Sequence, residues 1–405
     1  MTNSLSSQEL SAKQLFTIVA VLTAVVVTFA CGACLVPLLT LFRDQFGIST
    51  GDAAATTTAY FAGCILVLFF CSRLSDAFGR KPVTAVSLTF TLISMSVLNG
   101  IESYSMFLVI RFLQGSAAGL ISSSALTWLA DCLVKRSTLL ASACSTGAPS
   151  LGFAIGATVI GIFLERPTDV YAILQAMEIA VMLSIVAVLC AEDSVKDSQI
   201  KLKEVIKPHL KFIYDTQIGL LPVSIVFAVC WSVSSLVQGF AAAFCEALFS
   251  AESAATASSI LFGVFIVCNA LGTLIGTKRS VKKLQLFFGV FFISALTVLL
   301  AFNFRWVAVF YIFAALTGAL LGLATSLAMQ LLLADASPKD RAGLIGSCCF
   351  AGYVGAATTG LVAGWFATFE PLEVLNMAYL CAIGVLWFIA QLLLFCSGRQ
   401  IKSRL

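Results

Sequence analysis

Two ionisable residues lie inside long apolar segments of the sequence, where a charge needs a chemical reason. Arg111 lies within the apolar run 105–131, and Glu178 lies near the middle of the run 170–190. A charged side chain in hydrocarbon is costly unless it is paired or faces a water-filled cavity. Arg111 therefore indicates either a polar cavity or a side chain that reaches the membrane interface. Glu178 is interpreted either as a proton carrier or as a locally hydrogen-bonded acid.

The other reactive side chains form no catalytic pattern. His209 is the only histidine, so few residues are suited to general acid–base catalysis. The sequence also shows no nucleophile–base set and no phosphate-binding loop. Cys31 and Cys34 share a helix face, but no histidine or acid nearby completes a metal site. We therefore expect a protein that is not an enzyme, with no metal and no cofactor.

The elements that must position these residues are transmembrane helices. Hydrophobic residues make up 60% of the chain and charged residues 11%, too few to cover a soluble domain of 405 residues. Apolar runs long enough to cross about 30 Å of hydrocarbon recur along the sequence. We predict an all-α membrane protein with twelve transmembrane helices in two six-helix bundles, near 15–41, 53–72, 82–100, 105–131, 138–164, 170–190, 217–246, 253–276, 284–303, 306–334, 342–368 and 372–396.

The basic residues follow the positive-inside rule. With a cytoplasmic N-terminus, twenty of the 24 lysines and arginines fall in cytoplasmic segments, and only Arg43, Arg166 and Arg305 fall on the opposite face. The long basic loop between the sixth and seventh spans is either a solvated tether or a short helix on the membrane surface. The predicted organisation is a cytoplasmic N-terminus (residues 1–14), a first six-helix bundle (15–190), a cytoplasmic linker (191–216), a second six-helix bundle (217–396) and a cytoplasmic tail (397–405).

The two halves of the chain repeat a pattern. Leu129-Ala130-Asp131 is followed by Arg136, Ser142, Cys144 and Gly147, and Leu333-Ala334-Asp335 is followed at matching spacing by Arg341, Ser347, Cys349 and Gly352. An offset of 204 to 205 residues covers half of the chain. The repeat predicts two similar halves related by an axis along the membrane normal.

A charged motif joins the second and third spans, Ser72-Arg73-Leu74-Ser75-Asp76-Ala77-Phe78-Gly79-Arg80-Lys81. It resembles the cytoplasmic loop signature of the major facilitator superfamily, with Ser72 in place of the leading Gly and Ala77 in place of the first Arg. The resemblance implies an inner gate in which opposite charges at helix ends hold one conformation. The implied gate residues are Asp76, Gly79, Arg80, Lys81 and Asp131, with Asp131 paired to Arg80.

Two further motifs resemble the branch of this superfamily that exchanges drugs or metabolites for protons. Arg111-Phe112-Leu113-Gln114-Gly115 is similar to its Arg-x-x-Gln-Gly pattern, and Gly147-Ala148-Pro149-Ser150-Leu151-Gly152 partly matches its glycine- and proline-containing fifth span. The resemblance implies that Arg111 faces the cavity and influences protonation there, and Glu178 is the second candidate for proton coupling. The implied hinge and packing positions, which could also serve close packing alone, are Gly147, Pro149, Gly152, Gly352 and Gly355.

In this fold the cavity is lined mainly by the first, fourth, seventh and tenth spans. Those spans offer aromatic and neutral polar groups beside Arg111, and the first span lacks an embedded acid. A buried cation would need a counter-charge, so a neutral, zwitterionic or weakly anionic organic molecule fits better than a cationic one. The predicted cavity residues are Thr28, Cys31, Cys34, Gln114, Ser122, Trp231, Ser234, Gln238, Tyr311 and Gln330.

The resemblance implies a secondary transporter that moves a small organic solute by alternating access, with proton-coupled export as the leading expectation. A proton symporter or facilitator that imports a metabolite is the alternative, and a transporter-like receptor is a second one. The expected partners are a small-molecule substrate, protons and the lipid bilayer, with no nucleic acid, and the chain is expected to be a monomer. The expected location is the plasma membrane (the inner membrane of a bacterium), with both termini in the cytoplasm.

Overall fold

The computed structural model describes residues 11–47, 50–134, 136–164, 166–194, 219–249, 251–275, 279–334, 336 and 341–404. Within these ranges the chain is helical and contains no strand. The first half contains α1 (Ala12–Ala33), α2 (Leu35–Phe46), α3 (Thr50–Cys71), α4 (Leu74–Phe78), α5 (Arg80–Leu98), α6 (Tyr104–Leu133), α7 (Thr138–Phe163) and α8 (Pro167–Cys190). The second half contains α10 (Leu220–Leu248), α11 (Ala251–Leu274), α12 (Val281–Asn303), α13 (Val307–Leu333), α14 (Arg341–Phe366) and α15 (Leu372–Arg404).

Helix length and composition support the predicted twelve crossings. In the described part of the chain, eleven helices are long and apolar enough to span a membrane, and Ala55–Cys71 within α3 is a shorter apolar helix. The first span differs from the continuous helix expected over 15–41, because α1 ends at Ala33 and α2 begins at Leu35. Pro37 lies in the first turn of α2, where its missing N–H is tolerated. The fold is the predicted all-α membrane fold.

Serine side chains begin several of the spans. Ser11 accepts a hydrogen bond from the backbone N–H of Gln14 at the start of α1, and the Gln14 side chain bonds back to the Ser11 N–H. Ser103 caps α6 and Ser137 caps α7 in the same way, through their side-chain oxygens. These caps satisfy backbone donors that a helix leaves unpaired at its N-terminus.

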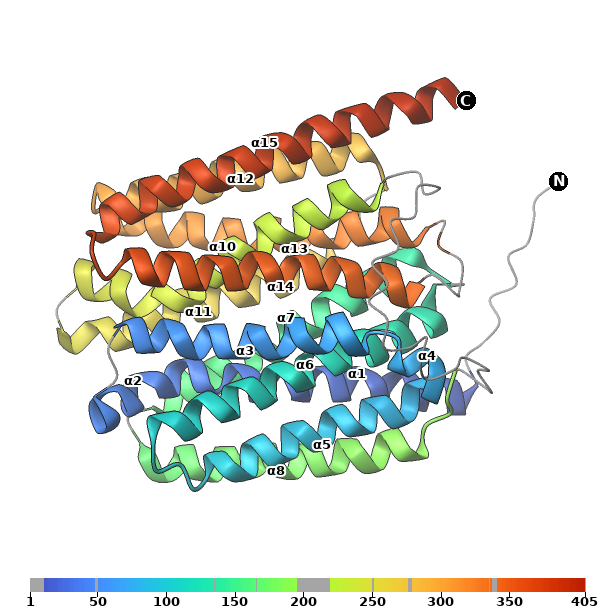
Figure 1. The fold of residues 1–405 in the computed structure, drawn as a ribbon, viewed down its shortest axis with the longest axis horizontal. Helices are drawn as coiled ribbons and strands as arrows, with labels where there is room; N and C mark the ends of the chain where they lie inside the picture. The colour runs from blue at the N-terminus through green and yellow to red at the C-terminus, as the bar shows by residue number, and fades with distance from the viewer. Residues whose placement is uncertain are drawn as a thin grey trace.

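The helices form two halves packed side by side (Figure 1). One half comprises α1 to α8 and the other α10 to α15, and they meet where α7 packs on α11 and α3 packs on α14. The start of α1 and the end of α15 lie at the same end of the molecule as α4 (Figure 1), as an even number of crossings requires. We call this end, which carries α4, Asp76 and Asp131, the charged end.

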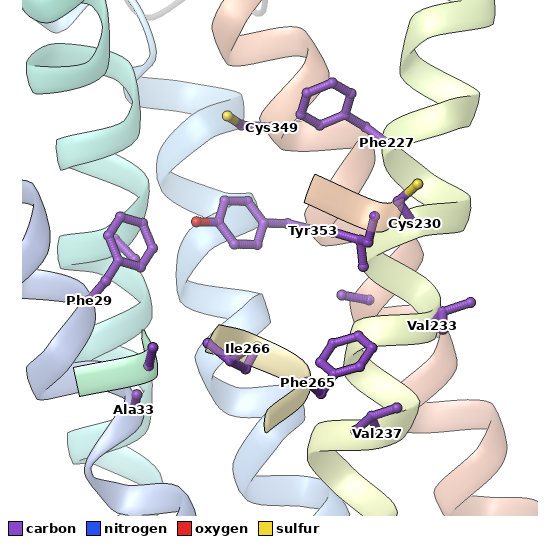
Figure 2. Packing of buried hydrophobic residues seen from close by; sticks show 14 of the residues in the cluster. Phe29, Ala33, Phe227, Cys230, Val233, Val237, Phe265, Ile266, Cys349 and Tyr353 are labelled. Carbon is purple, nitrogen blue, oxygen red and sulfur yellow. The ribbon is translucent and has the colours of Figure 1, made fainter. Parts of the chain in front are cut away.

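Lipid-facing and interface-facing surfaces differ in exposure and not in polarity. Leu183 on α8 and Phe388 on α15 are 65% and 57% exposed, whereas Phe29 on α1 and Phe227 on α10 are buried (Figure 2). Because hydrocarbon solvates exposed leucine and phenylalanine, α8 and α15 serve as outer supports.

Several predicted features fall partly outside the described residues. Of the predicted linker 191–216, only residues 191–194 are described, so His209 and its neighbouring lysines lie outside. In the predicted tail 397–405, α15 continues to Arg404. The limits of the predicted segments stay predictions.

Candidate functional site

One buried arginine joins three helices at the charged end. Arg80 begins α5 directly after Gly79, whose φ of 94° favours glycine. The Arg80 side chain is 3% exposed, and its Nη1 donates to Asp76 Oδ1 at 2.5 Å and to Ser75 Oγ at 2.6 Å. Its Nε lies 3.5 Å from Asp131 Oδ2, within ion-pair distance but without a hydrogen bond. The guanidinium thus connects α4, α5 and the end of α6.

The N-terminus of α5 is capped by a residue from a distant segment. Asp193, just after α8, accepts hydrogen bonds from the backbone N–H groups of Arg80 and Lys81, both at 3.1 Å. Lys81 Nζ also donates to the carbonyl of Leu189 at 3.2 Å. A carboxylate is favourable at a helix N-terminus, so this contact stabilises the loop that presents Arg80. The sequence analysis missed Asp193, because it lies more than a hundred residues from its partners and no local pattern marks it.

Arg111 is buried on α6 among neutral partners. It is 3% exposed, its Nη1 donates to the carbonyl of Gly32 at 2.8 Å and to Gln114 Oε1 at 3.3 Å, and its Nε donates to the carbonyl of Thr56 at 3.4 Å. The Tyr60 ring lies 4.7 Å from the guanidinium carbon, a cation–π contact. The side chain is therefore enclosed by protein, and the predicted influence of Arg111 on protonation stays a prediction.

Two small cavities lie between the halves. The central cavity, of about 80 Å³, is lined by residues of both halves that include Phe61, Ser122, Trp231, Ser234 and Tyr353. The arginine cavity, of about 90 Å³, lies farther from the charged end. Its lining residues include Thr56, Thr57, Arg111, Ser258 and Ser259. Gln238 lines both cavities. Each volume holds about three water molecules at roughly 30 Å³ each.

Tyr353 on α14 is the main residue that the sequence analysis missed at this interface. Its side chain is 2% exposed and projects toward the side of α1 on which Phe29 lies (Figure 2). Its hydroxyl lies 3.5 Å from Ser122 Oγ on α6, and its ring contacts Trp231 edge-on at 4.7 Å between centroids. A tyrosine in a long apolar segment gives no sequence signal for its direction, so only packing reveals it.

The halves contact each other near both ends, which explains the small volumes. Toward the charged end, a Cβ added to Gly147 on α7 would lie 2.5 Å from Thr273 Oγ1 on α11. At the opposite end, a Cβ added to Gly161 would lie 3.3 Å from Ser259 Cβ. A drug-sized ligand needs a pocket of at least about 300 Å³. The halves therefore have to separate before such a ligand can enter.

Four of the ten predicted cavity residues line the central cavity, namely Ser122, Trp231, Ser234 and Gln238. The other six lie outside both cavities. Gln114 donates to the carbonyl of Cys31 at 3.0 Å, and the Cys34 thiol donates to the same carbonyl at 3.0 Å. Tyr311 donates to the carbonyl of Ala257 at 2.8 Å. Thr28 and Gln330 are buried within helix packing.

Glu178 lies on α8 against α5, outside the two cavities. It accepts hydrogen bonds from Ser96 Oγ and from Asn99 Nδ2, the latter at 3.2 Å. These contacts tie an outer support helix to its neighbour. Its predicted role in proton coupling is not tested by this arrangement and stays a prediction.

The predicted hinge positions divide into two groups. Gly152 packs closely against Phe29 and Ala30 of α1, and Gly355 packs against the backbone of Ala228 on α10, so both act within one half. Gly352 is likewise covered by Trp231 of its own half. Gly147 faces α11 of the other half, and Pro149 lies inside α7 where that helix lines the central cavity. Among these glycines, Gly147 is thus the one that lies against the other half, and its role as a hinge stays a prediction.

The sequence profile of the Major Facilitator Superfamily matches residues 21–343, about four fifths of the chain. The chain belongs to this superfamily. It is therefore a multi-pass membrane transporter and not an enzyme. Its fold is that of solved superfamily structures: the human organic anion transporter MFSD10 (TETRAN) superposes with a TM-score of 0.71 at 15% identity, over 95% of this chain and 100% of that chain. The nucleoside transporter NupG gives a TM-score of 0.67 at 12% identity, over 93% of this chain and 99% of the other.

Curated superfamily relatives match over parts of their length. The inner membrane transport protein YnfM of Escherichia coli strain K12 is 25% identical over 36% of this chain and 35% of its own. The multidrug resistance protein MdtL of Klebsiella pneumoniae is 32% identical over 23% of this chain and 24% of its own. The transporter YceJ of Bacillus subtilis is 24% identical over 62% of this chain and 63% of its own. Each match spans less than two thirds of the relative.

Proposed function

We propose that this superfamily member exports a small organic solute in exchange for protons, with the solute bound between the two halves. The observation that carries the proposal is the pair of cavities at the interface, each lined by apolar and polar residues from helices of both halves. Both are too small for a drug-sized solute, so binding requires the halves to move apart. Rocking of two similar bundles about a central site is how such repeats achieve alternating access.

Outward transport is supported by the motifs and by the names of relatives, and exchange for protons is supported by the motifs. Short segments of the chain match proteins named multidrug resistance protein MdtL from Klebsiella pneumoniae and from Shewanella species. We assign proton coupling to Arg111 and Glu178. We assign the inner gate to the cluster of Asp76, Arg80 and Asp131, whose ion pairs would form and break as the charged end closes and opens.

The proposal includes a cellular setting. The protein works as a monomer in the plasma membrane, the inner membrane of a bacterium, with the charged end in the cytoplasm. Arg80, Lys81 and Arg136 lie at this end, as the positive-inside rule requires of a cytoplasmic face.

The test is transport by the purified full chain in proteoliposomes. Counterflow over a panel of antibiotics, sugars, nucleosides and amino acids identifies a solute, and an imposed pH gradient then tests coupling. Exchange predicts that the solute moves toward the more acidic compartment. Uptake that ignores the gradient, or that follows the protons, would contradict proton exchange.

Proton symport or facilitated uptake is the second candidate, and one observation favours it. Among the described residues that line the two cavities, none is Asp or Glu, so no acid there competes with the solute for a proton. Reversal of the pH gradient separates the candidates. A symporter drives the solute in the direction of proton flow, and a facilitator gives equal rates for both gradients.

A further inference from the structure

Arg111 has neutral partners only, although it is buried at the interface between the halves. Its contacts are the carbonyls of Gly32 and Thr56, the amide oxygen of Gln114 and the ring of Tyr60. No carboxylate pairs with it among the described residues. Uncharged acceptors leave a net positive charge in a low-dielectric region, where an unpaired charge is costly. The site therefore favours the arrival of a negative charge.

The guanidinium also keeps donors available. Its hydrogen bonds in the described structure use Nε and Nη1, and none uses Nη2. A guanidinium carries five N–H donors in a planar fork that matches a carboxylate or a phosphate. Since Arg111 lines the arginine cavity, the unused Nη2 donors are the ones that a ligand there can engage.

The lining of the arginine cavity combines polar and apolar residues. Besides Arg111, its polar residues are Thr56, Thr57, Gln238, Ser258 and Ser259. The remaining lining is apolar and includes Leu35, Leu39 and Phe262. The volume of about 90 Å³ accommodates a carboxylate group but not a whole drug-sized molecule. Gln238 lines both cavities, so the two cavities are neighbours at the interface.

We propose that the transported solute is an amphipathic organic acid whose anionic group binds Arg111 in the arginine cavity, while its apolar body extends toward Trp231 and Tyr353 in the central cavity. The inference rests on the proposed function, because it names the substrate class of the same interface. It goes beyond that function, because it assigns the sign of the substrate charge and the residue that recognises it. A cationic solute at this position meets like-charge repulsion in a low dielectric.

The experiment uses matched ligands with the unmodified protein, so it does not depend on a variant that folds. The full chain in nanodiscs at pH 7.5 is titrated with 4-phenylbutyrate, with 4-phenylbutyramide and with 4-phenylbutylamine, and binding is followed by the tryptophan fluorescence of the protein. These ligands share the apolar body and differ in the charge of the head group. We expect the acid to bind at least about tenfold more tightly than the amide and the amine. Equal binding of the three, tighter binding of the amine, or no binding of the acid would overturn the inference.

Two further arms locate the site and identify the anion. Arg111→Gln is expected to abolish the preference for the acid, Arg111→Lys to retain part of it, and the control Arg166→Gln, whose side chain is 73% exposed, to retain all of it. Replacement of chloride by gluconate is expected to leave the preference for the acid intact. If chloride instead blocks the acid completely at physiological concentration, the site is an inorganic anion site and the inference fails.

The outcomes separate the inference from the proposed function. Proton-driven exchange of neutral or cationic solutes without binding of the acid leaves the proposed function standing and removes the inference. Binding of the acid at Arg111 without transport of any solute in the counterflow panel supports the anion site and contradicts the proposed function.

Discussion

The hydroxyl of Tyr353 on α14 lies 3.5 Å from the hydroxyl of Ser122 on α6, so one tyrosine reaches across the interface between the two halves. This distance is at the outer limit of a hydrogen bond. The same ring contacts Trp231 of its own half and Phe61 of the other half, with centroids 4.7 Å and 6.1 Å apart. Tyr353 therefore makes both a polar contact and aromatic contacts at the centre of the protein.

Removal of the Tyr353 hydroxyl and of its ring should have different effects. Tyr353→Phe keeps the ring contacts, so we expect a loss of about 0.5–1.5 kcal/mol in the free energy of unfolding. Tyr353→Ala leaves a cavity in buried packing and should cost about 3–5 kcal/mol. Thermal unfolding of the protein in nanodiscs measures both. Tyr171→Phe, at a residue 57% exposed, is the control and should change nothing. Equal effects of the Phe and Ala variants would show that the ring packing contributes little.

The arginine cluster at the charged end gives a ranked prediction. Asp76 Oδ1 accepts a hydrogen bond from Nη1 of the buried Arg80 at 2.5 Å. Asp76→Asn should therefore destabilise the protein by about 1.5–3 kcal/mol, the range for a hydrogen bond to a charged group, and by more than Asp169→Asn in an exposed ion pair. Chemical denaturation in nanodiscs gives the two values.

The matched control for this cluster is the exposed pair of Arg166 and Asp169. Their atoms are 3.9 Å apart and both side chains are well exposed, so Asp169→Asn should change stability by less than about 1 kcal/mol. A loss from Asp76→Asn that is no larger than the loss from Asp169→Asn would contradict the described geometry.

Gly147 should control how closely the halves approach near the charged end. A Cβ at this position would lie 2.5 Å from Thr273 Oγ1, and that hydroxyl is held by a hydrogen bond to the carbonyl of Ala270. Gly147→Val should therefore favour conformations that are open at the charged end and slow transport by at least about tenfold. Spin-label distances across the charged end, in a background without native cysteines, measure the opening.

Gly343→Ala is the control for Gly147, because an added Cβ at Gly343 on α14 meets nothing within 4 Å. It should leave both the distances and the rate unchanged. If Gly147→Val also leaves the distances unchanged, the contact of α7 with α11 does not limit closure.

Glu178 offers a direct test of the proposed proton coupling. Glu178→Gln cannot take up a proton but retains an oxygen that can accept from Ser96 and Asn99. If Glu178 couples transport to protons, this variant loses the response to a pH gradient and keeps solute counterflow. Ser96→Ala removes one hydrogen bond and leaves the carboxylate, so it should keep the response to the gradient. A Glu178→Gln variant that still follows the pH gradient would remove Glu178 from the coupling assignment.

The sequence by itself determined the class of the protein. Apolar runs of membrane-spanning length, the repeat at an offset of 204 to 205 residues and the motif from Ser72 to Lys81 were sufficient for the fold, because each is a local or periodic property of the chain. The motif also identified Asp76 and Arg80, which lie four residues apart and form an ion pair across the break at Gly79.

Only the tertiary structure decided which polar residues reach the interface. In a membrane both the lipid-facing and the protein-facing sides of a helix are apolar, so hydrophobic periodicity does not mark the inner face. Trp231, Ser234 and Gln238 therefore looked no different in the sequence from Gln114, which bonds to a backbone carbonyl outside the cavities. Asp193 and Tyr353 gave no sequence signal, because their partners lie more than a hundred residues away and packing alone brings them together.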